Sequence, residues 1–351
     1  MEELTATGNT IVSVSPENIQ LDRQVKKVLA CKPILAIILK ETVAECNEMS
    51  CEDIENCIEG DILIEEVPLT PTEVITGSSQ EDYLPGEGLI RYDIRTYLRL
   101  PGYEEPALSK ILIDVEAQKE DTPGYSLAAR GLFYCCRMIS SQLDTEFTLK
   151  STDQKKYDNI KKVYSIWICT DTSEKRQNSI EKYSMNKEML FGQNDDDYRY
   201  DLLSAIIVNV GKFHDNEDTD SRMLNVLSIL VDSNIDASKK IHMLKDKYDV
   251  PVTHEIEKEV TTMTSYTANI IAKGEAIGEA RGKAIGEARG KAIGETIGEA
   301  RGRTLGRIDE IFQSVQDGDY STKRGAEKLG ITESEFIRLM EEAGYKVPTT
   351  A

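Results

Sequence analysis

The chain has few of the residues that build structural metal sites or disulfide frameworks. It contains three histidines and seven cysteines, and no two cysteines form a C-x-x-C pair. His214, His242 and His254 lie well beyond the last cysteine, Cys169. A zinc site with spaced Cys and His ligands is therefore not expected, and reduced thiols in a cytosolic protein are the better interpretation.

Long apolar runs are also missing. No stretch reaches the roughly 20 consecutive apolar residues that a membrane helix needs. The first residues, Met1-Glu2-Glu3-Leu4-Thr5, have neither the basic segment nor the apolar core of a secretory signal. We therefore expect no membrane segment and a cytoplasmic location.

Positive charge is the third deficit. The 351 residues include 42 Lys and Arg against 62 Asp and Glu, a net charge of −20. Proteins that coat nucleic acid by bulk electrostatics need an excess of basic residues, so that class is not expected. An enzyme that acts on DNA through a carboxylate site remains compatible with this balance.

A strand-like run at residues 110–118 carries the acids that stand out. Read with period two, one face is apolar and the other contains Asp114, Glu116 and Gln118. Such an arrangement is typical of a strand with one face in a core and one polar face.

An equally strand-like run at residues 89–98 places Asp93 and Arg95 on a polar face and Tyr92 and Ile94 on an apolar one. If the two runs pair as neighbouring strands, the carboxylates of Asp93 and Glu116 converge, and two converging carboxylates can hold a hard cation. The alternative is that both acids are ordinary residues of a solvated sheet face.

The order of segments predicts an α/β fold. We expect helices over residues 21–49, broken at Pro33, and another over 124–143. Strands are expected at 61–67, 89–98, 110–118, 162–170 and 202–210, and further helices within 220–270. Helices covering a mixed sheet are the natural closure of this order.

This layout resembles the PD-(D/E)XK nuclease superfamily, and within it the bacterial PD-(D/E)XK nuclease family transposases, or recombination-promoting nucleases. The resemblance spans about residues 20–170. It is carried by Asp22-Arg23, Pro33-Ile34-Leu35-Ala36, Tyr92-Asp93-Ile94-Arg95, Val115-Glu116-Ala117-Gln118, Pro123-Gly124-Tyr125, Arg130-Gly131-Leu132-Phe133-Tyr134 and Val163-Tyr164-Ser165-Ile166-Trp167-Ile168-Cys169. The chain departs from the superfamily in having no proline before Asp93 and in placing Gln118 where lysine is usual.

The resemblance implies a restriction-endonuclease-like mixed sheet flanked by helices and a metal-dependent DNA endonuclease. It implies that Asp93, Glu116 and the backbone carbonyl of Ala117 hold Mg²⁺, or Mn²⁺, and that Asp93, Glu116 and Gln118 are the catalytic residues. Gln118 can position the attacking water by hydrogen bonds. Because a first-helix glutamate often faces the metal in this superfamily, Glu45 is a further candidate ligand.

Three residues are candidates for binding the DNA substrate. Arg95 shares the face of Asp93 and could supply the positive charge that Gln118 lacks, and Tyr125 and Arg130 begin the helix after the Glu116 strand. The alternative function is a catalytically degenerate nuclease fold that binds DNA or a protein partner. Metal-dependent cleavage separates the two, whereas strand transfer by a transposase leaves no sequence signature of its own.

Glycine recurs at every fourth position from Gly274 to Gly306. Nine glycines cost about 0.8–1 kcal/mol each relative to alanine, so a lone stable helix is not expected. Either copies of the repeat pack together as an oligomerising C-terminal stalk, which we favour, or the repeat is a flexible spacer. Residues 322–343 read as helix, turn, helix with Thr332 as N-cap, but the second helix is too acidic for the DNA major groove.

The expected organisation has five parts. They are a loose leader (1–20), the nuclease-like core (21–210), a helical extension (211–272), the glycine repeat (273–307) and a small helical hairpin domain (308–351).

Overall fold

The structure is a computed structural model, and it describes residues 16–64, 81–84, 88–102, 109–143, 146, 156–193, 199–215 and 217–348. The chain divides into two compact units, one ending at Ile271 and the other beginning at Ala272. Most of the predicted leader lies outside the described residues, and its last part belongs to helix α1 (Pro16–Ala30).

The first unit is built on a six-stranded mixed sheet with the order β1-β4-β5-β6-β8-β7. Strands β5, β6 and β8 are parallel, and the remaining pairs are antiparallel. The strands are β1 (Ile58–Ile64), β4 (Ile94–Arg99), β5 (Lys110–Glu120), β6 (Lys162–Asp171), β7 (Ser179–Ser184) and β8 (Leu203–Asn209). The prediction of a mixed sheet flanked by helices is confirmed.

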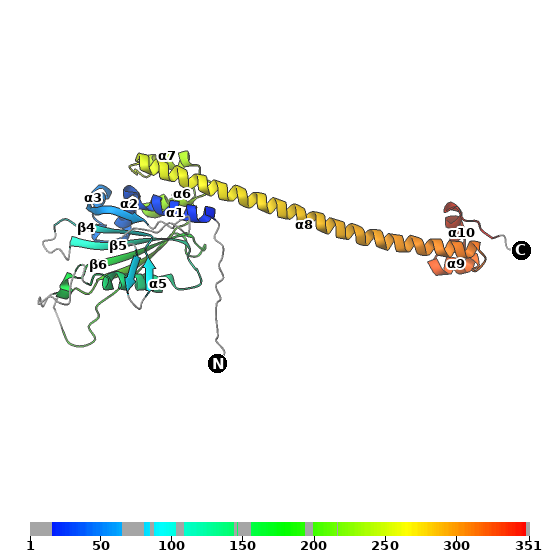
Figure 1. Cartoon of the computed structure of the whole chain (residues 1–351), viewed down its shortest axis with the longest axis horizontal. Coiled ribbons are helices and arrows are strands. Elements are labelled where there is room, and N and C mark those ends of the chain that lie inside the picture. The colour runs from blue at the N-terminus through cyan, green and yellow to red at the C-terminus, as the bar shows by residue number, and fades with distance from the viewer. Residues whose placement is uncertain are drawn as a thin grey trace. The chain divides into compact units, whose positions relative to one another are not determined.

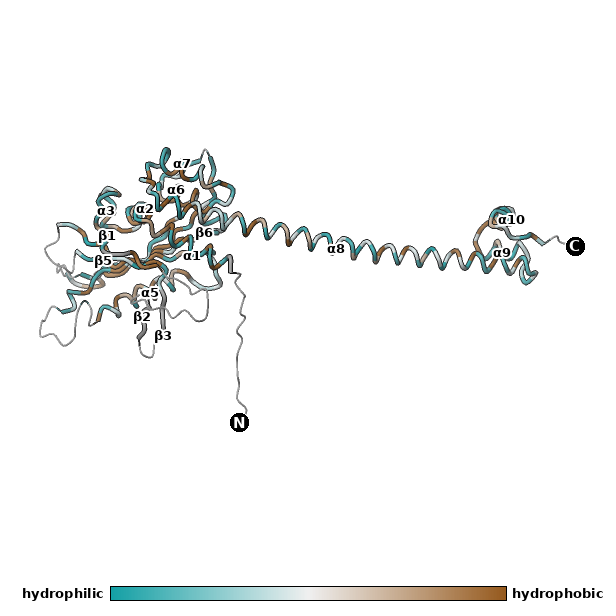
Figure 2. The backbone as a smooth tube through the Cα atoms, turned by 45° about the horizontal axis from the view of Figure 1, so that its top comes forward, coloured by the Kyte–Doolittle hydropathy of each residue, from teal (hydrophilic) through white to brown (hydrophobic). Residues whose placement is uncertain are grey.

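Helices cover both faces of this sheet (Figure 1). Helices α1, α2 (Lys32–Thr42), α3 (Cys51–Cys57) and α6 (Arg222–Val231) lie on one face, and α5 (Leu127–Ser140) lies on the other. The apolar residues concentrate in the central strands between these layers (Figure 2). The expected period-two alternation of β5 follows from this arrangement, because each face of the strand meets a different helical layer.

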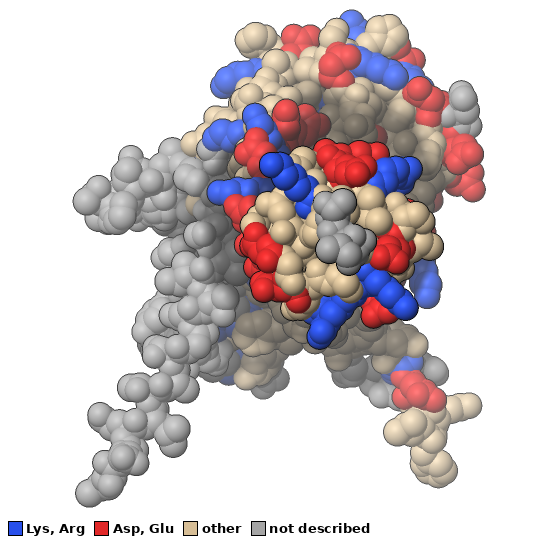
Figure 3. All heavy atoms as spheres, turned by 90° about the vertical axis from the view of Figure 1, so that its right-hand side faces the viewer, with Lys and Arg blue, Asp and Glu red and all other residues tan. Residues whose placement is uncertain are grey.

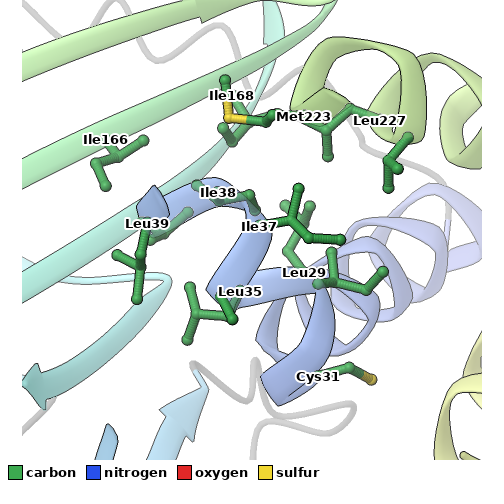
Figure 4. Packing of buried hydrophobic residues seen from close by; sticks show 14 of the residues in the cluster. Leu29, Cys31, Leu35, Ile37, Ile38, Leu39, Ile166, Ile168, Met223 and Leu227 are labelled. Atoms are coloured by element: carbon green, nitrogen blue, oxygen red, sulfur yellow. The ribbon is translucent and has the colours of Figure 1, made fainter. Parts of the chain in front are cut away.

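Helices α2 and α6 are the two deeply buried helices of the first layer, with eight buried residues each. In α2, Ile37 and Ile38 lie on the side that faces Ile168 of β6 and Met223 of α6, as Figure 4 shows. Pro33 lies in the first turn of α2, where a backbone N–H has no helical partner to lose. The predicted break between two helices at this proline is therefore present.

Helix α5 packs closely on β6 and β8. Ser126 caps the helix by accepting a hydrogen bond from the N–H of Ala129. A Cβ at Gly131 would lie 3.0 Å from Trp167 Nε1 and from the Cβ of Ala205, so glycine permits this approach. The helix thereby holds the second layer against the face that carries Asp114 and Glu116.

The predicted strand at residues 89–98 is wrong in one respect, because the chain forms two strands there. Strand β3 (Gly88–Arg91) pairs with β2 (Glu81–Leu84) in a separate two-stranded sheet, and only β4 pairs with β5. The break falls at Tyr92 and Asp93. Tyr92 consequently packs against Tyr134 of α5, on the opposite side of the sheet from Ile94.

The first unit also contains the 3₁₀ turns η1 (Ala44–Cys46) and η2 (Lys156–Asn159) and helix α7 (Ala237–Asp246). Helix α8 (His254–Gln316) begins in the first unit and ends in the second. Every helix of the described ranges is too short or too polar to cross a membrane. On the face drawn in Figure 3, acidic and basic side chains are interspersed.

The second unit combines the last turns of α8 with α9 (Thr322–Leu329) and α10 (Glu333–Glu342) around a small core that includes Phe312 and Phe336. Thr332 caps α10 by accepting from the N–H of Glu335, as predicted. The glycine repeat is helical throughout, which differs from the expectation for an isolated chain.

Candidate active site

Asp93 and Glu116 lie side by side at the point where β4 begins. The N–H of Asp93 donates to Glu116 Oε1 at 3.0 Å, and the N–H of Ala117 donates to Asp93 Oδ2 at 2.9 Å. Each carboxylate thus binds the backbone at or beside the other. The structure brings together the two residues that the matched polar faces had paired.

A third carboxylate, Asp114, belongs to the same cluster. It precedes Glu116 by two residues on β5, so both side chains lie on the α5 face. Ser165 Oγ donates to Asp114 Oδ2 at 2.8 Å, and the indole N–H of Trp167 donates to Ser165 Oγ at 2.9 Å. Asp114 Oδ1 is buried and receives no N–H or hydroxyl donor from the described residues.

Burial makes these acids hard to ionise. Burial raises the pKa of Asp114 to about 7, although hydrogen bonds with Glu116 and Ser165 oppose the shift. Burial, followed by the charges of Asp114 and Asp93, holds the pKa of Glu116 well above its ordinary value. The pKa values of Asp114 and Glu116 are raised together, so ionisation of both carboxyls at once is disfavoured.

Lys26 of α1 supplies a positive charge at Asp93. Its Nζ lies 2.7 Å from Asp93 Oδ1 and 2.9 Å from Asp22 Oδ2, and the residue is only 4% exposed. Burial alone would lower the pKa of Lys26, but the carboxylates of Asp93 and Asp22 outweigh it and raise that pKa. Burial raises the pKa of Asp93, and the Lys26 ammonium works against that rise.

Arg95 and Gln118 occupy different depths of the same face. Arg95 is buried, its register partner is Asp114, and its guanidinium lies 5.1 Å from the centre of the Tyr92 ring. Arg95, a candidate for substrate binding, is thus placed inside the protein, where its charge acts on Asp114. Gln118 is half-buried, and its side chain makes no hydrogen bond within the described residues.

Tyr125 and Arg130 come together at the start of α5. The guanidinium of Arg130 donates to the hydroxyls of Tyr125 at 2.5 Å and Tyr134 at 2.9 Å, and it lies 4.9 Å from the Trp167 ring. Burial and the charge of Glu116 raise the pKa of Tyr134 to about 12. Arg130 thus connects the surface at Tyr125 to the carboxylate cluster.

Glu45, the further candidate ligand, lies away from Asp93 and Glu116. Glu45 accepts from Tyr164 Oη at 2.7 Å and lies 3.0 Å from Lys162 Nζ. Lys162 is in register with Ile111, five residues before Glu116, which corresponds to about 16 Å along the strand. Tyr164 also packs on the opposite face of the sheet from Trp167.

The oxygens at Asp93 and Glu116 fit the needs of a hard cation. Within the described ranges, no group of three or more His, Cys, Asp or Glu side chains could hold a metal ion by itself. Mg²⁺, however, takes one or two carboxylates and completes its shell with water. A carboxylate accepts about four hydrogen bonds, so Asp93 and Glu116 keep lone pairs for a cation beside their present partners.

Comparisons with protein-family models, with curated proteins and with solved structures found no match to this chain.

Sequence reasoning missed Lys26 and the links from Asp114 through Ser165 to Trp167. Ser165 and Trp167 are two residues apart on β6, as Asp114 and Glu116 are on β5, so each pair shares one face of its strand. In the parallel pairing of β5 and β6, Ser165 lies beside Asp114 and Trp167 beside Glu116. Lys26 gives no comparable signal, because helical spacing alone does not tell which buried polar residue reaches the sheet.

Proposed function

We propose that this protein is a metal-dependent DNA endonuclease of the recombination-promoting, transposase-like type, with Asp93 and Glu116 as its metal ligands. The observation that supports it is the reciprocal contact of these two residues, in which each carboxylate accepts from backbone beside the other. Gln118 follows on the same face, and Arg130 lies nearby with access to solvent. The resemblance to PD-(D/E)XK nucleases supports the same function.

The residues of the site have separate roles in this proposal. A Mg²⁺ or Mn²⁺ ion bound by Asp93, Glu116 and the carbonyl of Ala117 would polarise the phosphate and activate water. Glu116 would hold the cation as a carboxylate, because carboxylate ligands bind deprotonated. Gln118 orients the attacking water through its amide, and Arg130 binds a phosphate of the DNA backbone.

Incubation of the protein with supercoiled plasmid, with Mg²⁺ or with EDTA, tests this proposal. We expect Mg²⁺-dependent cleavage that disappears in Asp93→Ala and in Glu116→Ala, since each change removes a metal ligand. Glu45→Gln is the matched control, because Glu45 lies at the far end of the strands, and it should cleave like the wild type. Cleavage by Asp93→Ala at the wild-type rate would show that the site is misassigned.

If no form of the protein cleaves DNA, the alternative of a catalytically degenerate nuclease fold is favoured. Such a protein would keep the fold and the DNA-binding or protein-binding surface without the reaction. DNA binding by a chain that never cleaves would distinguish this outcome from loss of folding.

A second function, self-association through residues 273–307, is supported by the surface of α8. A Cβ at any of the nine glycines of the repeat would meet open space. The apolar residues there are half or more exposed, namely Ile277, Ile285, Ile293, Ile297 and Leu305. Helices in proteins gain most of their stability from packing an apolar face, so a second copy of the repeat is the partner we propose.

The charge of the repeat is compatible with such packing. It carries eight Lys or Arg and five Glu, a net +3 in a chain of −20. A chain truncated after Ala272 should remain folded and show a smaller oligomeric state by light scattering than the full chain. An equal subunit number for both would leave the repeat as a spacer.

A further inference from the structure

The outer face of α5 has a composition unlike the rest of the chain. Its exposed positions are Ala129, Phe133, Cys136 and Ser140, which share one side of the helix at three- and four-residue spacing, and Tyr125 precedes them. Tyr125 is 48% exposed and Phe133 is 52% exposed. Two aromatic rings are therefore presented to solvent about 12 Å apart along the helix axis.

Acidic residues are absent from this segment. Residues 122–143 contain no Asp or Glu, whereas the whole chain has 62 acids in 351 residues. Of the two arginines in this segment, Arg137 is buried and Arg130 is half-buried. A stretch without negative charge in so acidic a protein favours an anionic partner. Arg130 is the half-buried cation of the face, and its hydrogen bonds to Tyr125 and Tyr134 fix its position.

The face also leads directly to the carboxylate cluster. The Arg130 guanidinium lies over the Trp167 ring, and Trp167 is bonded through Ser165 to Asp114. Tyr134, which Arg130 also binds, packs edge-on against Trp167 with the ring centres 5.2 Å apart. A DNA phosphate bound by Arg130 would therefore contact a residue that packs on the buried partners of the carboxylate cluster.

We propose that α5 binds unpaired nucleotides of the DNA substrate, with the rings of Tyr125 and Phe133 as stacking surfaces and Arg130 as the phosphate contact. The inference rests on the proposed nuclease function and adds its substrate class. In a duplex each base face is already covered by its neighbours, so exposed rings on a helix gain a partner only where bases are unpaired. The exposed Ala, Phe, Cys and Ser side chains of α5 also offer little for reading base edges in a groove.

Fluorescence anisotropy in EDTA, where a metal-dependent site cannot cleave, tests the inference with a labelled oligothymidylate and a duplex of equal length. Replacing a stacking aromatic by alanine typically lowers the affinity for single strands by a factor of roughly ten. We expect that loss for Phe133→Ala with the oligothymidylate, little change with the duplex, and recovery in Phe133→Trp. Phe191→Ala is the matched control, because Phe191 is 97% exposed in the loop after β7 and should leave both affinities unchanged.

Three results would overturn the inference. Phe133→Ala could bind the oligothymidylate like the wild type, or it could weaken both DNA forms equally, which would indicate a contact without preference for unpaired bases. It could also change the oligomeric state at unchanged DNA affinity, which would make α5 an interface between copies. Because binding in EDTA does not require catalysis, a protein that binds the oligothymidylate but never cleaves plasmid would refute only the nuclease proposal.

Discussion

Replacing Asp114 by asparagine tests the electrostatics of the site without any substrate. Asp114 is fully buried, and its pKa is raised from 3.8 to about 7. Between these two pH values the folded chain holds a proton that the unfolded chain has released, so stability falls as pH rises. At about 1.4 kcal/mol per pKa unit, this group lowers the unfolding free energy by roughly 2 kcal/mol between about pH 5 and about pH 7.

Asparagine has nearly the shape of aspartate but carries no titrating proton. Its Nδ2 can donate to Glu116, and its Oδ1 can accept from Ser165 in place of the carboxylate oxygen. We therefore expect Asp114→Asn to be more stable than the wild type near neutral pH and to lose less stability with rising pH. Between the same two pH values, the wild type should lose roughly 2 kcal/mol more unfolding free energy than Asp114→Asn.

Urea unfolding in EDTA, followed by tryptophan fluorescence, measures this directly. Trp167 is the only tryptophan of the chain, is buried, and is linked to Asp114 through Ser165. Asp215→Asn is the control, because the Asp215 side chain is 62% exposed and its removal should leave the pH dependence unchanged. If Asp114→Asn loses stability with rising pH as steeply as the wild type, the pKa of Asp114 is not raised in the folded protein.

Two further predictions concern Lys26 and Gln118. Lys26→Met should destabilise the protein in EDTA by roughly 3–5 kcal/mol, because it leaves the buried Asp93 without its counter-ion. Added Mg²⁺ should raise the thermal midpoint of this variant more than that of the wild type. Equal shifts of the two midpoints would count against metal binding at Asp93. Gln118→Ala should slow plasmid cleavage without abolishing it, since a residue that positions water is less critical than a metal ligand. Gln118→Lys should keep or increase the cleavage rate. A rate for Gln118→Ala equal to that of the wild type would remove Gln118 from the mechanism.

The common face of Asp114 and Glu116 could be predicted because strand periodicity is strict. Residues alternate between the two faces of a strand, so Asp114 and Glu116 had to share a face, and β5 shows that they do. The break at Tyr92 and Asp93 could not be predicted in this way. There the Asp93 carboxylate accepts a hydrogen bond from the N–H of Ala117. A side-chain acceptor in place of a backbone carbonyl leaves no periodic pattern in the sequence.

The helices show a different limit. Spacing located the helices and the break at Pro33, but it did not tell which polar residue of the first two helices meets the sheet near Asp93. That residue is Lys26 of α1, whereas Glu45 lies after α2 and meets Lys162. The position of a helix over a sheet is set by packing of its apolar residues, which the order of polar residues does not record.

The buried charges around Asp93 explain why protonation would compete with the proposed cation for these carboxylates. Asp93, Asp114 and Glu116 are three buried carboxylates, while Lys26 and Arg95 are the buried cations that act on them. Fully ionised, this set carries a net negative charge in a medium that solvates charge poorly, which is why the pKa values of Asp114 and Glu116 are raised. A divalent cation would relieve the same excess, so cation and proton compete for the site. The affinity for Mg²⁺ should therefore rise as pH rises through the raised pKa values of this pair. An affinity that is independent of pH across that range would place the cation elsewhere.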